Sequence, residues 1–170
     1  MVLVLSSCRA SPPPPAAKPS AAAVTDRVRV FLIAPHDGGR SGAAAGCGDS
    51  AVPVEVTLPA PAPALAGALR ALLAMSEPLD ARSGLSNPLY ASSLELARVE
   101  RAGGEARVEL RGYLELSGDC EGRRILAQLR ATALQFQGVD RASFTVDGEP
   151  LPSLLAQAAA ASAPTAAAGP

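Results

Sequence analysis

The pattern of apolar and polar residues predicts two strands near the start of the foldable chain. Residues 27–33 (RVRVFLI) carry apolar side chains on both faces, which predicts a central strand. Residues 52–58 (VPVEVTL) alternate between apolar and polar. Because Pro53 has no backbone N–H, this second strand is expected at a sheet edge. Residues 34–50 between them form a long glycine-rich connection, which is typical of a functional or mobile loop.

Two later segments have apolar residues at helical spacing. The face of the first is formed by Leu65, Leu69, Leu72 and Leu73. The face of the second, which begins near Cys120, is formed by Ile125, Leu129, Ala133 and Phe136. Pro78 ends the first helix, and the Gly138 region is a typical stop for the second.

The remaining regular segments are a hairpin and one more strand. Residues 94–99 and 106–110 flank Ala102-Gly103-Gly104, a good hairpin signal. Residues 141–146 alternate as a half-buried strand, and a turn at Asp147-Gly148 follows. The order β-β-α-β-β-α-β predicts an α+β fold, a small mixed or antiparallel sheet with two main helices packed on one face.

Composition limits the foldable part of the chain to one domain. Of the 170 residues, 9–24 and 154–170 are rich in Ala, Pro and Ser and have almost no bulky apolar side chains. Such segments cannot bury enough surface to offset chain entropy, so both are predicted to be disordered, the first as an extended tether. Residues 25–153 remain as the predicted domain, with residues 1–8 before the tether.

Charge and hydropathy exclude several classes of partner. The net charge is −1 and the charges are interspersed, with no basic stripe of the kind that nucleic-acid binders use. No apolar run reaches the length that spans a bilayer. We expect no nucleic-acid partner, no metal and no cofactor.

The first eight residues, MVLVLSSC, resemble the end of a lipoprotein signal, in which small residues precede a cysteine that receives the lipid. This interpretation makes residues 1–8 a truncated signal and predicts lipidation of Cys8, with residues 9–24 tethering the domain to a membrane. A complete signal has a basic region and a longer apolar stretch than the one present here. The alternatives are a start codon placed too far downstream, or an unmodified N-terminus in which Cys8 is a free thiol.

Cys47 and Cys120 are the cysteines left once Cys8 is assigned to the lipid. In an exported protein an even pair is best explained as a disulfide. A zinc site with His36, Asp37 or Asp49 is the weaker alternative, because the chain has one His and no CxxC. A redox-active or nucleophilic cysteine is disfavoured for the same reasons.

Taken together, these landmarks resemble the GerMN domain, a small module of bacterial envelope and spore-germination proteins. The resemblance covers residues 27–151, and its most specific part is the ordered set RVRVFLI, VPVEVTLP, GLSNPLY and the helix and strand of residues 120–151. The family is not known for an active site, so the resemblance implies a non-catalytic structural, assembly or protein-binding role outside the cytoplasm, with an envelope protein as partner.

Two hypotheses about the binding surface follow. Edge strands offer unpaired backbone groups, so the strands containing Val54 and Phe144 are candidate docking edges. The alternative function is binding of a small ligand or cell-wall fragment under the 34–50 loop, with Tyr90 and Tyr113 in one cleft. The His36-Asp37 pair is the nearest approach to a catalytic dyad, and a solvated loop explains it better.

Overall fold

The computed structural model describes residues 25–59 and 63–162. Its elements are β1 (Thr25–Ala34), β2 (Ala43–Gly46), β3 (Asp49–Pro59), α1 (Ala64–Leu73), β4 (Ser93–Ala102), β5 (Glu105–Tyr113), α2 (Asp119–Leu134), β6 (Arg141–Val146), β7 (Glu149–Pro150) and α3 (Leu151–Ser162). The predicted α+β class is confirmed, with two short strands and one helix beyond the predicted order.

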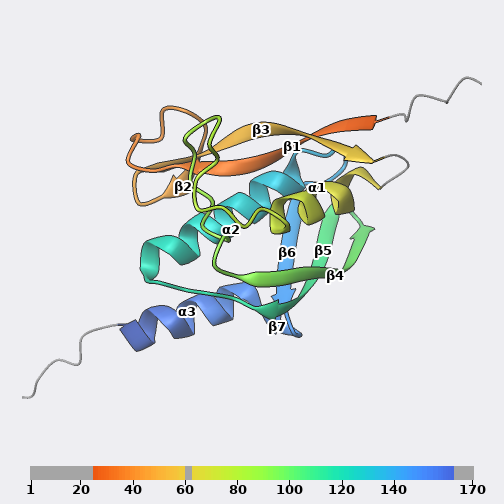
Figure 1. The fold of residues 1–170 in the computed structure, drawn as a ribbon. Helices are drawn as coiled ribbons and strands as arrows, with labels where there is room; N and C mark the ends of the chain where they lie inside the picture. The colour runs from red at the N-terminus through yellow and green to blue at the C-terminus, as the bar shows by residue number, and fades with distance from the viewer. Residues whose placement is uncertain (1–24, 60–62, 163–170) are drawn as a thin grey trace, which may run out of the picture.

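The strands are divided between two sheets. The first sheet has the order β1-β3-β2 and is antiparallel, and the second has the order β4-β5-β6-β7 with a parallel β5–β6 pair. Figure 1 shows α1 and α2 between the two sheets, where α1 contacts β1 and β4 and α2 contacts β1 and β6. The helices therefore cover two sheets rather than one face of a single sheet.

The main core forms where α2 meets strands of both sheets. The predicted apolar stripe of α2 faces it, because Ile125, Leu129 and Ala133 have no exposed surface and Phe136 is half-buried. Strand β6 contributes Phe144, which is 3% exposed. This stripe and the inner faces of both sheets make up most of the buried apolar surface.

Glycines are required at two close contacts or turns. In α1, a Cβ at Gly67 would lie 2.4 Å from a terminal methyl of the buried Leu58 in β3, so a larger residue would force this side chain to move. Gly103 and Gly104 have φ values of 55° and 76°, as the two-residue turn between β4 and β5 requires. The predicted hairpin is confirmed.

Strand β1 lies at an edge of the first sheet, so its predicted central position is wrong. Both of its faces are nevertheless covered. Val30 and Leu32 belong to the main core, while Ile33 packs with Ala45 and Ala51 against the Ala127 side of α2. The apolar residues on both faces of β1 therefore reflect packing against both faces, and they do not show that β1 lies between two other strands.

The free edge of β1 is covered by polar groups. The Phe31 N–H donates to Thr132 Oγ1 at 3.1 Å, and the Arg29 N–H donates to Gln135 Oε1 at 3.3 Å. Ile33 exchanges backbone hydrogen bonds of 2.8 and 2.7 Å with Ser86 in the loop after α1. Helix α2 and this loop take the place of another strand, which leaves this stretch of edge with its donors satisfied.

The prediction that the C-terminal tail is disordered is wrong for residues 154–162, which form most of α3. Leu151 is fully buried and Leu154 and Leu155 are half-buried, so the start of the helix is anchored on the core. The alanines that follow are the best helix formers and extend it. Residues 163–170, 1–8 and 9–24 lie outside the described part of the chain.

We predict that Thr132→Val destabilises the protein by about 1–3 kcal/mol, because the partly buried Phe31 N–H loses its acceptor while the side-chain volume is kept. The measurement is the free energy of unfolding from urea titrations. Thr57→Val, on the exposed face of β3, is the matched control and should change stability by no more than about 0.5 kcal/mol. Equal effects of the two substitutions would show that α2 does not satisfy this edge.

Candidate functional site

The two predicted disulfide cysteines are bonded to each other. Cys47 and Cys120 are joined by an S–S bond of 2.06 Å with their Cα atoms 5.9 Å apart. Cys47 lies in the tight turn between β2 and β3, and Cys120 in the first turn of α2. The bond therefore ties the glycine-rich connection to the helix that organises the core.

A buried ion pair lies beside the disulfide and makes the same link. Asp49, which is 1% exposed, accepts a hydrogen bond of 2.6 Å from Arg124 Nε and another of 2.8 Å from the His36 N–H. The Arg124 hydrogen bond is the main cause that lowers the pKa of Asp49, and burial opposes it. Asp49 and Arg124 are separated by 75 positions in the sequence, so no local pattern predicts their contact.

Asp37 organises the loop before β2. Its carboxylate accepts hydrogen bonds from the Gly39 N–H at 2.9 Å, the Ser41 N–H at 2.8 Å and the Ser50 hydroxyl at 2.8 Å. Desolvation acts to raise the pKa of Asp37, but hydrogen bonds from Ser41, Ser50 and Gly39 outweigh it and lower the pKa to about 2. These contacts make Asp37 a structural residue of the loop, and they leave His36 contributing its backbone N–H.

A second buried polar group involves the predicted GLSNPLY loop. The Asn87 amide donates to the Met75 carbonyl at 2.7 Å, and its oxygen accepts from the Leu89 N–H at 3.2 Å and from Gln128 Nε2 at 3.1 Å. Asn87 and Gln128 are both almost fully buried. Polar residues at core-facing positions of a helix, such as Gln128 and Thr132, are the sequence signal that such partners exist.

The candidate docking residues Val54 and Phe144 face inward. Val54 is half-buried and packs against the main core, and Phe144 is buried in it. A charge at Phe144 would disrupt the core, so its substitution cannot test docking. The predicted edges have to be judged from their backbone groups instead.

Strand β3 is the middle strand of its sheet, but β2 pairs with it only from Asp49 to Ala51. Beyond Ala51 this side of β3 is an open edge, so the edge position predicted from Pro53 is correct for that part of the strand. Every second residue of an antiparallel strand directs its N–H and C=O away from its partner. The register with β1 places Pro53, Glu55, Thr57 and Pro59 in these outward positions. Two of the four lack an N–H, which blocks much of this edge against pairing with another chain.

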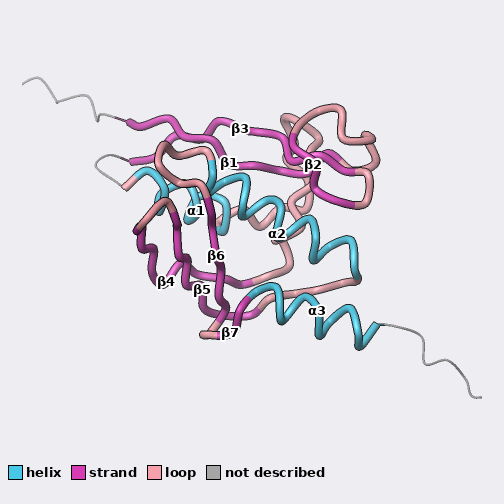
Figure 2. Tube along the Cα trace, turned by 180° about the vertical axis from the view of Figure 1, so that it is seen from behind, coloured by secondary structure: helices cyan, strands magenta, loops and turns pink. Residues whose placement is uncertain are grey.

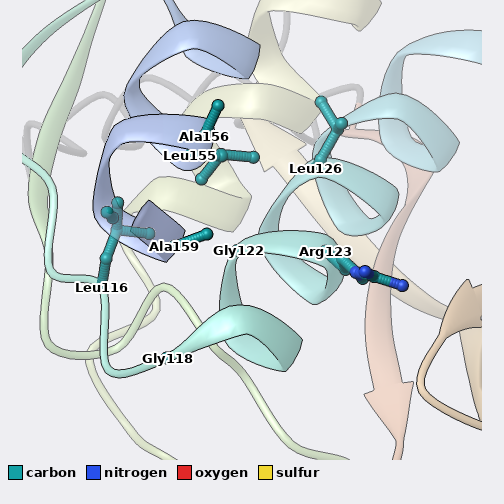
Figure 3. A pocket seen from close by; sticks show the side chains of 9 residues that line it. Leu116, Gly118, Gly122, Arg123, Leu126, Leu155, Ala156 and Ala159 are labelled. Atoms are coloured by element: carbon teal, nitrogen blue, oxygen red, sulfur yellow. The ribbon is translucent and has the colours of Figure 1, made fainter. Parts of the chain in front are cut away.

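Four hollows among the described residues have volumes between about 220 and 520 Å³. Neither Tyr90 nor Tyr113 lines any of them. Figure 3 shows the smallest, between α2 and α3, with Leu126 and Leu155 on the facing helices. A Cβ at Gly122 would lie 3.0 Å from Leu155, which explains the close approach of the two helices there.

Comparison with known proteins places this arrangement in a family. Residues 39–152 match the family described as "Germane: Sporulation and spore germination", which is more than half of the chain. The chain belongs to the Germane family. The resemblance to the GerMN domain is thereby confirmed, although the Germane match begins after β1 and not at residue 27.

Neither a curated protein nor a solved structure matches the chain. Within the described residues of this Germane domain, no helix is long and apolar enough to cross a membrane. The same residues bring together no group of three or more His, Cys, Asp and Glu side chains able to hold a metal ion.

We predict that replacing both Cys47 and Cys120 with serine lowers the free energy of unfolding by roughly 4 kcal/mol, because the bond closes a loop of 73 residues. Denaturant unfolding of the wild type with and without a dithiol reductant should show the same loss. Cys8→Ser is the control and should keep full stability and its response to reductant. A wild-type midpoint that reductant does not move would contradict the prediction.

The lowered pKa of Asp37 predicts a pH-dependent contribution to stability. The folded pKa of about 2 lies below the ordinary value of 3.8, so the contribution is present above pH 3.8 and is lost as the pH falls toward 2. The stability difference between wild type and Asp37→Asn should shrink over this range. Glu77→Gln, at an exposed position, controls for the loss of one negative charge. A difference that stays constant down to pH 2 would exclude this role.

Proposed function

We propose that this Germane-family protein is a non-catalytic lipoprotein of the cell envelope that works by binding or scaffolding other envelope proteins. The observation that carries the proposal is the disulfide inside a Germane domain. Disulfides persist in oxidising compartments, so the Cys47–Cys120 bond supports a location outside the cytoplasm. Membership in a sporulation and spore-germination family supports a role in envelope assembly in spore formers.

The structural roles of the polar residues support a non-catalytic function. Asp37 holds the loop before β2, and Asp49 holds that loop and α2 together through His36 and Arg124. Asn87 and Gln128 link the loop after α1 to α2. The carboxylates of Asp37 and Asp49 are therefore engaged in fixing the fold.

Anchoring through Cys8 would attach the membrane to one end of the domain. Figures 1 and 2 show that the start of β1 and the disulfide-linked turn lie at opposite ends of the molecule, because α2 begins at the end away from Thr25. A lipid on Cys8 would therefore be connected, through residues 9–24, to the end of the domain that lies away from the disulfide-linked turn.

The anchor is tested by expressing the chain with its native upstream sequence in a bacterial host and separating membrane from soluble fractions. We expect the wild type in the membrane fraction, cleaved between Ser7 and Cys8, with an intact mass above that of the polypeptide beginning at Cys8 by a thioether-linked diacylglyceryl group and, where the new α-amino group is acylated, a fatty acid. Cys8→Ser should move to the soluble fraction, because the thiol that carries the lipid is gone, while Ser11→Ala should behave as the wild type. An unmodified mass for the wild type would overturn the lipoprotein proposal.

A further inference from the structure

Strand β4 forms one edge of the second sheet. In the half of β4 next to the Gly103-Gly104 turn, the residues whose backbone N–H and C=O groups point away from β5 are Arg101 and Val99. The register shifts by one residue between Leu96 and Arg98, which is a β-bulge. Beyond this bulge the outward groups are those of Leu96 and Leu94.

A hollow lies beside the Leu94–Leu96 half of this edge. It has a volume of about 390 Å³ between α1 and β4, and its lining residues are Arg70, Leu73, Ala74, Leu94, Glu95 and Leu96. Leu94 is buried and Leu96 and Leu73 are half-buried, so the base of the hollow is apolar. Arg70 is exposed in the last turn of α1 and has no ion-pair partner among the described residues.

The other half of β4 is protected against pairing. Arg98, Glu100 and Arg101 are exposed there, and Arg98 forms an ion pair with Glu100. Charged side chains and a bulge are the usual means by which proteins block an edge strand. The stretch before the bulge has no proline at its outward positions. Helix α1 packs beside it, but no hydrogen bond from another described segment reaches the outward Leu94 and Leu96 backbone groups, in contrast to the edge of β1.

We propose that an extended segment of a partner protein binds here as an additional strand on β4. The unpaired N–H and C=O groups of Leu94 and Leu96 select a polypeptide backbone. Side chains on one face of the added strand, two residues apart, would fill the apolar base beside Leu73 and place an acidic group near the Arg70 guanidinium. The inference rests on the proposed protein-binding function and gives it a surface and a class of partner.

The test selects binders to the purified full-length protein from a phage library of random decapeptides and maps them by amide hydrogen exchange. Peptide binding should slow exchange of the Leu94 and Leu96 N–H groups, because these become hydrogen-bonded. The Glu95 N–H between them already points into the sheet and should keep its rate. This alternation distinguishes an added strand from any ligand that merely occupies the hollow, and uniform protection or none at β4 would overturn the inference.

Two pairs of matched variants test the hollow and its charge. Ala74→Glu places a charged side chain in the lining of the hollow, and Arg70→Glu reverses the charge there. Each should weaken binding of the selected peptides by about tenfold or more. Ala160→Glu on α3 and Arg130→Glu on α2 change exposed positions in the same way and should stay within about twofold of the wild type. Thermal unfolding confirms that all four variants are folded. Equal losses across a pair would overturn the inference.

A second copy of the chain is the other occupant to exclude. Concentration-dependent dimerisation that Ala74→Glu abolishes would assign this edge to self-association and overturn the choice of a partner protein. The readouts are independent of the membrane anchor. If the protein is lipidated but binds no strand at β4, this inference is wrong and the lipoprotein proposal stands. If it binds a strand at β4 but carries no lipid, the lipoprotein proposal is wrong and this inference stands.

Discussion

The structure depends on helix α2, which packs in the core between the two sheets and also hydrogen-bonds to the edge of β1. Its apolar stripe, with Ile125 and Leu129 at the centre, supplies the core between the sheets. Thr132 on the helix and Gln135 at its C-cap accept hydrogen bonds from the edge of β1, so the Phe31 and Arg29 N–H groups have protein partners. The position of the helix along the strand is thus set by hydrogen bonds as well as by packing. The disulfide to Cys47 and the Asp49–Arg124 pair hold its N-terminal end at the β2–β3 turn.

The treatment of strand edges connects this architecture to function. Helix α2 and Ser86 cover β1, and prolines interrupt the open part of β3. In β4, charged side chains and a bulge hinder pairing along the half next to the turn. The segment before the bulge has unpaired backbone groups and lies beside an apolar hollow. An open stretch of strand edge beside an apolar hollow gives a partner strand a defined place to bind. This fits a Germane-family protein that acts through assembly.

The predicted elements agree with the structure where the pattern is strong. The helices, the β4–β5 hairpin and the strand at residues 141–146 follow from spacing and from glycine, because these signals act locally along the chain. The place of β1 did not follow, since a strand with two apolar faces can be covered by a helix as well as by neighbouring strands. Helix α3 was missed because its alanines bury little by themselves, and the anchoring by Leu151 becomes visible only once the core exists.

The candidate site also combines features that the sequence predicts with features that depend on tertiary packing. Residue order was enough to predict the family and the α+β class, and cysteine number favoured a Cys47–Cys120 disulfide over a zinc site, because both properties are carried in the chain. The inward placement of Val54 and Phe144 and the lack of a strand beside Leu94 and Leu96 follow instead from how the folded chain packs. Whether a strand edge is open depends on what packs beside it. Those neighbours, such as Thr132 for Phe31, come from segments about a hundred residues away, a separation that no local pattern encodes.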